Sequence, residues 1–285
     1  MRKSNFNALL NEKLKVFVLA FFVFSLYSCG NVNSKNTMSV NDINKKTETA
    51  GNELISSSNP TAALDKAKKD RKVVFLVITG TGATGLDKVV EIAKEANGKV
   101  SKSIIVQMNK DEATNSSLVT KLGIASVPVP FIVVISSKGI PVAGFPSYQV
   151  TTDLLIKSVP SPKEEEIISV LSEKKPVFIV ISKKGLTDKK TIIANCKAAS
   201  SKIASKPAVV EIDYSDSKES AFLTKIGVTS LNDKTITLVI NSAGQIADKY
   251  EGVVLESALT TSASKVIKSG GCCPGGSSKG CGPKK

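Results

Sequence analysis

The alternation of hydrophobic and polar positions repeats once along the chain, between residues 62 and 268. Short runs rich in β-branched residues predict strands, and segments whose apolar residues recur every three to four positions predict helices. Each copy is expected to follow the order strand, helix, strand, helix, strand, strand, helix. The expected elements are 73–78, 86–96, 103–108, 116–121, 131–135, 140–145 and 152–159 in the first copy, and 177–181, 189–204, 208–213, 220–226, 236–240, 246–250 and 255–267 in the second.

Two sequence matches fix the register of this repeat. A Val-Phe-Leu-Val-Ile run begins at Val74, and a Val-Phe-Ile-Val-Ile run begins 103 residues later at Val177. A Thr-Lys-Leu-Gly-Ile run begins at Thr120, and a Thr-Lys-Ile-Gly-Val run begins 104 residues later at Thr224. The near-identical spacings indicate two copies of one structural unit.

The domain organisation follows from this repeat and from the composition of the segments around it. We expect two tandem α/β domains, residues 61–160 and 161–268, each a mixed β-sheet flanked by helices. Residues 161–166 are expected to be a short linker that leads into a helix opening the second copy. Residues 29–60 are rich in Asn, Ser, Thr and Lys and predict a flexible tether with a reach of roughly 30 Å. The Gly- and Pro-rich residues 269–285 predict a disordered tail.

The first thirty residues carry a targeting pattern. A basic start is followed by an apolar run, residues 16–26, which is shorter than the roughly 20 residues that a helix needs to cross a bilayer. This pattern predicts a signal peptide over residues 1–28. Its end, Leu26-Tyr27-Ser28-Cys29-Gly30, resembles the lipobox of bacterial lipoproteins, although Tyr27 replaces the usual small residue.

The lipobox resemblance implies a membrane anchor at Cys29. In lipoproteins this Cys becomes the lipidated N-terminus, so we expect a diacylglyceryl group on Cys29 to hold the protein in a lipid bilayer of the bacterial cell envelope. The outer membrane is expected rather than the inner one, with the folded part facing the periplasm or the cell exterior. A plain signal peptide with a coincidental Cys29 is the alternative.

The first copy contains a loop that is similar to one in the thioredoxins. The run Leu122-Gly123-Ile124-Ala125-Ser126-Val127-Pro128 resembles the Tyr-Gly-Ile-x-x-Ile-Pro run of that family, and a strand and a Lys-Gly turn follow it. The resemblance covers residues 62–160 well and 164–268 more weakly, and it implies two thioredoxin-like domains. It also implies a cis-proline loop at Val127 and Pro128, whose preceding backbone pairs with extended peptides in that family. Alternatively, Pro128 only shapes the loop. In the second copy Asn232 stands where Pro128 falls.

The thiol pair of active thioredoxins is missing from both copies. Such a Cys-x-x-Cys pair lies at the first strand-to-helix turn, because a helix N-terminus lowers the pKa of the attacking thiol. The corresponding residues here are 82–85, Gly-Ala-Thr-Gly, and 185–188, Gly-Leu-Thr-Asp, and neither set contains Cys. We therefore expect no dithiol exchange at this turn, and a binding or scaffold protein rather than an enzyme.

A dinucleotide-binding interpretation competes at the same loop. Residues 80–85 satisfy Gly-x-Gly-x-x-Gly, and residues 214–218 satisfy the Tyr-x-x-x-Lys of short-chain dehydrogenases. A dinucleotide site, however, needs parallel strands where this sequence has a hairpin, and an acidic residue about 20 positions after the glycines. Asp111 comes 26 positions after Gly85, so we interpret both motifs as coincidental.

Composition narrows the chemistry further. None of the 285 residues is His, which excludes Ser-His-Asp and Cys-His catalysis and His-ligated metals within this chain. The formal net charge is +14, but the Lys residues are scattered and aromatic residues make up only 5%, so no nucleic-acid partner is expected.

The remaining Cys residues fall into two groups. Cys196 lies inside an expected helix and is interpreted as a small buried apolar residue. Cys272, Cys273 and Cys281 lie in the tail, where they could form a loop disulfide, capture a soft metal ion such as Cu(I) or Zn(II), or exchange thiols. Thiol-dependent redox or metal handling through this tail is therefore the alternative to a binding function.

Overall fold

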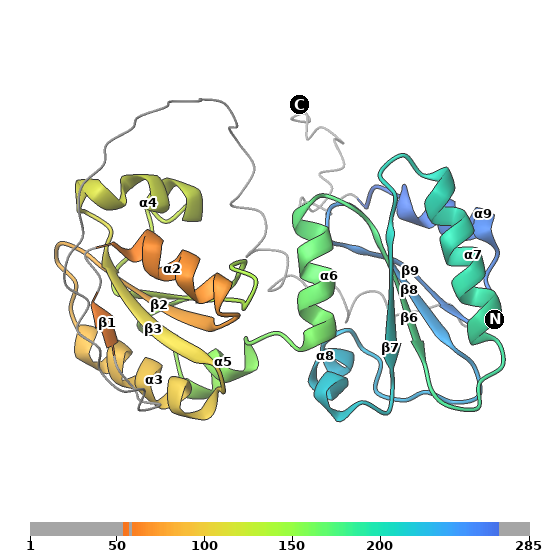
Figure 1. Cartoon of the computed structure of the whole chain (residues 1–285), viewed down its shortest axis with the longest axis horizontal. Helices are drawn as coiled ribbons and strands as arrows, with labels where there is room; N and C mark the ends of the chain where they lie inside the picture. Colours follow the sequence, from red (N-terminus) through yellow and green to blue (C-terminus); the bar gives the residue numbers. More distant parts are fainter. Residues whose placement is uncertain (1–53, 57–58, 268–285) are drawn as a thin grey trace, which may run out of the picture.

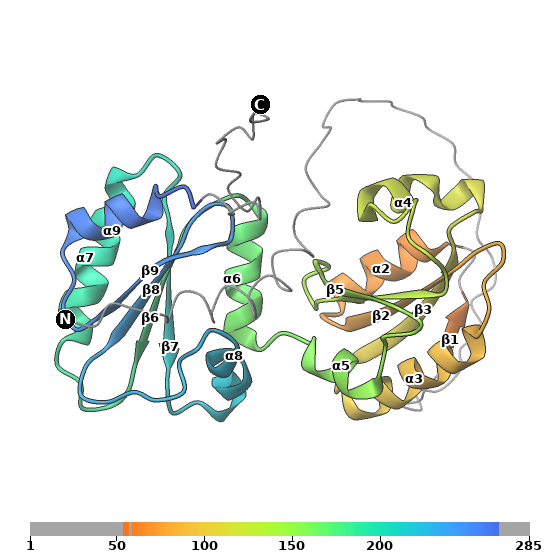
Figure 2. The same ribbon diagram turned by 180° about the vertical axis from the view of Figure 1, so that it is seen from behind.

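The computed structural model of the protein describes residues 54–56 and 59–267, which form two α/β domains that lie side by side (Figures 1 and 2). The first domain contains β1 (Leu54–Ser56), α2 (Pro60–Lys69), β2 (Val73–Thr79), α3 (Leu86–Lys99), β3 (Ser103–Asn109), the 3-10 helix Ala113–Asn115, α4 (Ser116–Leu122), β4 (Phe131–Ile135), β5 (Pro141–Pro146) and α5 (Thr152–Lys157). The second contains α6 (Pro162–Ser172), β6 (Val177–Ser182), α7 (Lys189–Lys202), β7 (Ala208–Asp213), the 3-10 helix Ser217–Glu219, α8 (Ser220–Lys225), β8 (Ile236–Ile240), β9 (Ile246–Glu251) and α9 (Glu256–Ala263).

Apart from the additional edge strand β1 of the first domain, the two sheets share one strand order. It is β1-β3-β2-β4-β5 in the first domain and β7-β6-β8-β9 in the second. In each domain the central strand pairs in parallel with one neighbour and antiparallel with the other, and the last two strands form an antiparallel hairpin. The expected fold class, two tandem thioredoxin-like domains that each have a mixed sheet flanked by helices, is confirmed.

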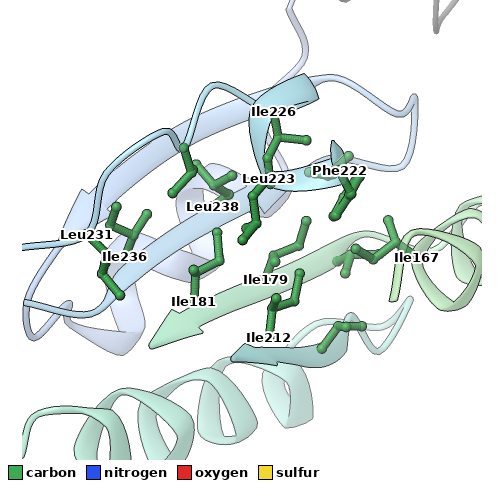
Figure 3. Close-up of a cluster of buried hydrophobic side chains, with 14 of the residues drawn as sticks. Ile167, Ile179, Ile181, Ile212, Phe222, Leu223, Ile226, Leu231, Ile236 and Leu238 are labelled. Atoms are coloured by element: carbon green, nitrogen blue, oxygen red, sulfur yellow. The ribbon is translucent and has the colours of Figure 1, made fainter. Parts of the chain in front are cut away.

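Side-chain alternation along the central strands places helices on both faces of each sheet. In β2, Phe75 and Val77 pack with α3 and α5, whereas Leu76 and Ile78 pack with α2 and α4. Residues two apart point to the same side of a strand, so a strand that is apolar at every position needs cover on both sides. The second domain repeats this arrangement. Figure 3 shows the isoleucines of β6 on the face that α6 and α8 cover.

The structure corrects the expected domain boundaries in two places. Residues 54–56 belong to the expected tether, yet they form β1, which pairs in parallel with β3. Residues 161–166 are not a linker, because Ser161 caps α6 and the helix begins at Pro162. The Ser161 hydroxyl accepts the Glu164 N–H, and the Glu164 carboxylate accepts the Ser161 N–H, which is a capping box.

Several expectations concern residues that the structure does not describe. The signal peptide, Cys29, most of the tether, and Cys272, Cys273 and Cys281 all lie outside residues 54–56 and 59–267. Within those ranges, no helix combines the length and the apolar character that a membrane crossing requires.

Candidate functional site

The cis-proline of the first domain lies two residues nearer to β4 than the sequence indicated. The cis peptide bond joins Val129 to Pro130, not Val127 to Pro128. Pro130 is buried and directly precedes β4, whereas Pro128 is exposed. Pro128 and Pro130 each follow a Val in this Val-Pro-Val-Pro run, so the sequence alone does not distinguish them. Pro130, which adjoins β4, is the one at the position of the cis-proline in the thioredoxin-like motif.

A hydrogen bond from the following hairpin identifies the same position in the second domain. The Ser147 N–H donates to the Pro130 carbonyl over 3.1 Å, and the Gly252 N–H donates to the Thr235 carbonyl over 2.8 Å. Both pairs occupy the same place in the repeat, since Pro130 directly precedes β4 and Thr235 directly precedes β8. The counterpart of the cis-proline Pro130 is therefore Thr235, and not Asn232, which the sequence places opposite Pro128.

The backbone beside this loop is engaged at Val127 and free at Val129. The Val127 N–H donates to the Ile124 carbonyl, and its own carbonyl accepts the Lys110 ammonium at 2.8 Å. Lys110 also donates to the Ala125 carbonyl at 3.0 Å. Both main-chain groups of Val127 are therefore already hydrogen-bonded within the domain. In the described part of the chain, Val129 takes part in no backbone ladder or loop hydrogen bond, so its N–H and carbonyl are the groups that remain.

An exposed aromatic side chain lies beside the free backbone. Tyr148 follows Ser147, whose N–H binds Pro130, and its side chain is 79% exposed. The chain then turns back, because Gln149 and Val150 both donate to the Pro146 carbonyl, and Val150 is buried. This turn holds the tyrosine ring outside the core, where its large apolar surface is available for contact.

The loop that would carry the thiols is held by a carboxylate. The Asp111 carboxylate accepts the Thr81 N–H at 2.6 Å, and this bond holds the pKa of Asp111 below its ordinary value. A side chain at Gly80 would bring its Cβ within 2.8 Å of the same carboxylate. The glycine at this position therefore makes room for Asp111. The helix α3 begins after Gly85, which has a left-handed backbone and offers no side chain.

The second domain has the same loops, but they are closed by side-chain hydrogen bonds. Asp188 precedes α7, at the place of Gly85, and its carboxylate accepts the N–H (3.0 Å) and the hydroxyl (2.7 Å) of Thr235. The Thr235 hydroxyl also lies 3.1 Å from that of Ser182. A proline at position 235 could not donate this N–H. The N–H at the position of Pro130 is therefore present in the second domain and is used inside it.

Cys196, the Cys residue within the described ranges, is confirmed as a buried apolar residue. Its side chain packs among α7, α9 and the sheet. Burial raises the pKa of its thiol to about 12, because the charged thiolate would lose its hydration. Cys196 is thus a neutral core side chain at physiological pH.

Sequence comparisons give no relative for this chain. No family model matches it, and no curated protein matches it. Each domain has the thioredoxin-like fold. The strand order and the pairing of the strands carry that assignment.

Solved structures with similar folds include single and tandem thioredoxin domains. Thioredoxin O2 from Arabidopsis thaliana is 18% identical, with 36% of this chain and 85% of that chain covered and a TM-score of 0.29. The first two thioredoxin domains of Saccharomyces cerevisiae Eps1p are 11% identical, with 75% and 98% covered and a TM-score of 0.28. Human ERp44 in its zinc-bound form is 11% identical, with 74% and 57% covered and a TM-score of 0.30. TM-scores this low add nothing to the assignment made from the strand order.

Proposed function

We propose that this protein is a membrane-anchored binding protein of the bacterial cell envelope, whose first domain holds an extended segment of a partner protein without thiol exchange. The free N–H and carbonyl of Val129, beside the exposed ring of Tyr148, carry this proposal. An extended peptide can pair with such a backbone segment, and an adjacent aromatic side chain adds apolar contact.

The absence of thiol chemistry is supported by the residues at the start of α3 and α7. Residues 82–85 and 185–188 contain no Cys, and Cys196 is buried with a raised pKa. A bound segment would therefore meet glycine and threonine backbone at the place where a thioredoxin presents its nucleophile. Binding would be reversible and independent of a reductant.

The second domain serves this proposal as a structural support. At the place of Val129 it has Lys234, whose main chain makes no backbone hydrogen bond in the described part of the chain, but Val253 stands where the first domain has the ring of Tyr148. Val253 and Leu255, which follow β9, are exposed and offer apolar contact, but neither is aromatic.

Membrane anchoring rests on the lipobox-like sequence that ends at Cys29. It is tested by Cys29→Ala in the full-length precursor, with metabolic labelling by a fatty acid and detergent phase partition as the measurements. The native protein should incorporate label and enter the detergent phase, whereas the variant should do neither. Equal partition of the two proteins would contradict the anchor.

Partner binding is tested with the mature full chain and a reduced, carboxymethylated protein as a source of extended segments. Tyr148→Ala should weaken this binding roughly tenfold, which is a common loss for a buried aromatic contact. Val253→Ala, at the corresponding loop position of the second domain, is the matched control and should bind as the native protein does. Equal affinity of all three proteins would overturn the proposed site.

Thiol or soft-metal handling through Cys272, Cys273 and Cys281 stays a prediction. The test is a chelator competition for Cu(I) between the native chain and a variant with Ser at all three positions. Equal Cu(I) affinity would remove metal capture from the alternatives.

A further inference from the structure

The outer edge of β7 differs from its counterpart in the first domain. There β3 is covered by β1, with Leu54 opposite Ile105, Ile55 opposite Val106 and Ser56 opposite Gln107. The second sheet ends at β7, and no strand in residues 54–56 or 59–267 pairs with its other side. The repeat thus has a strand position that is filled in one domain and vacant in the described part of the other.

The repeat register defines which groups of β7 face this vacancy. Phe75 pairs with Ile105 and Phe178 pairs with Val209, so Val209 corresponds to Ile105 and Glu211 to Gln107. The N–H groups of Ala208 and Tyr214 donate toward β6. Because alternate residues of a parallel strand direct their backbone groups to opposite neighbours, Val209, Glu211 and Asp213 direct theirs outward.

The outward residues of β7 are more exposed than their counterparts in β3. Ile105, which β1 flanks, is completely buried, whereas Val209 is only half-buried. Gln107 and Asn109 are half-buried, whereas Glu211 and Asp213 are exposed. The outward positions of β7 therefore remain accessible beside α6 and α7.

The chain between the domains cannot supply the missing strand. The repeat spacing of 103 residues makes residues 157–159 the counterpart of β1. These residues are instead the end of α5 and the turn after it, and α6 begins at Pro162. An occupant must come from another polypeptide or from a remote part of this one.

Charge indicates the chemistry of the occupant. Where β3 has the neutral amides Gln107 and Asn109, β7 has the carboxylates Glu211 and Asp213. Lys189 lies 3.1 Å from Glu211, but this ion pair is half-exposed and contributes little to binding or stability. Acidic edge residues repel strands of like charge and attract basic ones.

We propose that the β7 edge binds an extended basic segment of a partner protein, which adds to the second sheet as a parallel strand in the place of β1. The central residue of that segment would donate its N–H to the Val209 carbonyl and accept the Glu211 N–H. Lysine or arginine on the C-terminal side of that residue would pair with Glu211 and Asp213. This site is separate from the one at Val129, so neither proposal depends on the other.

The probe for this site is a synthetic peptide, acetyl-Lys-Lys-Leu-Ile-Ser-Lys-Lys-amide, which sets the Leu-Ile-Ser of β1 between lysines. Titrated into the mature full chain, it should shift the amide NMR signals of Val209, Glu211 and Asp213. The same peptide with Glu in place of Lys should bind at least roughly tenfold more weakly, because its charges match those of the edge. No shift, or shifts confined to other residues, would overturn the proposal.

Two further measurements separate strand addition from simple charge attraction. Replacing the central Ile of the basic peptide by Pro removes its N–H and should abolish binding, and equal binding of this peptide would overturn strand pairing. In the protein, Glu211→Gln with Asp213→Asn recreates the amides of β3 without changing side-chain shape. This variant should bind the basic peptide roughly tenfold more weakly than the native chain does, and unchanged affinity would overturn the charge assignment.

Discussion

The carboxylate of Glu165, in the first turn of α6, accepts the Ser137 hydroxyl at 2.9 Å and the Lys138 N–H at 3.0 Å. Ser137 and Lys138 belong to the turn between β4 and β5, so this one side chain joins the first domain to the second. Figure 1 shows α6 on the side of the second domain that faces the first. Hydrogen bonds to an ionised acceptor are roughly twice as strong as neutral ones.

Glu165→Ala should loosen the connection between the domains. The loss of these bonds should cost about 1–3 kcal/mol of domain coupling, because the groups are only half-buried and water replaces part of the interaction. Rotational correlation times from ¹⁵N relaxation should be equal for the two domains in the native chain and should diverge in the variant. Glu166→Ala removes a neighbouring carboxylate that pairs with Lys163 of the same helix, and it should leave the coupling intact. Equal correlation times in the Glu165→Ala protein would contradict this role.

Lys110→Met should weaken partner binding in the first domain by releasing the loop before the cis-proline. The ammonium group donates to the carbonyls of Ala125 and Val127, and without it that loop loses two of its attachments to the end of β3. We expect a loss of about 1–3 kcal/mol in the free energy of unfolding and weaker binding of the carboxymethylated protein. The control is Lys121→Met, an exposed Lys of α4. Binding and stability that fall equally in both variants would show that overall charge, and not the hydrogen bonds of Lys110, is responsible.

The sequence predicted the sheet elements well because their pattern is local. Val73–Thr79 and Val177–Ser182 are apolar at nearly every position, which is typical of central strands with helices on both faces. The three-residue strand β1 was missed because three residues carry no periodicity. The first turn of α6 lies in residues 161–166, for which the composition predicts a linker, although Ser161 and Glu164 have the spacing of a capping box.

The candidate site was harder to predict because it depends on contacts between distant segments. Val127 matches the family motif, but Lys110, 17 residues away, uses its carbonyl. Only the three-dimensional structure shows this. The position of Thr235 became clear through the Gly252 hydrogen bond, since the loop before β8 differs in length from the loop before β4. A signal for Pro130 existed in the sequence, namely a proline directly before an apolar strand.

Asp188→Ala should destabilise the second domain selectively. The variant leaves the buried Thr235 N–H and hydroxyl without their carboxylate, and an unsatisfied buried group costs about 1–3 kcal/mol. Hydrogen exchange should accelerate for the amides of β6 and remain slow for those of β2. Asp233→Ala, which removes an exposed carboxylate two residues before Thr235, should have little effect. Unchanged exchange in the Asp188→Ala protein would mean that the closure of this loop is not a source of stability.

Glu164 should make the stability of the second domain depend on pH. Its side chain is buried on α6, where it faces the Lys225 ammonium at 3.1 Å and the buried carboxylate of Glu219. Burial raises the pKa of Glu164 above its ordinary value of 4.5, although Lys225 opposes this shift. The folded protein therefore holds this proton more tightly than the unfolded chain does. This contribution to stability is complete below pH 4.5 and is lost as the pH rises through the raised pKa of the folded state.

The matched variant for this pH effect is Glu164→Gln, which keeps the side-chain shape and cannot ionise. Ionisation of Glu164 destabilises the native chain. Glutamine cannot lose a proton, so the variant is not destabilised in this way. The free energy of unfolding of the native chain, measured by denaturant titration, should therefore fall relative to that of the variant between pH 4 and pH 7. The Lys225 ammonium is more than one-third exposed, so water can solvate it when its partner is removed, and the variant should remain folded. A difference in unfolding free energy that stays constant over this range would show that Glu164 is ionised throughout, with the Lys225 attraction outweighing burial.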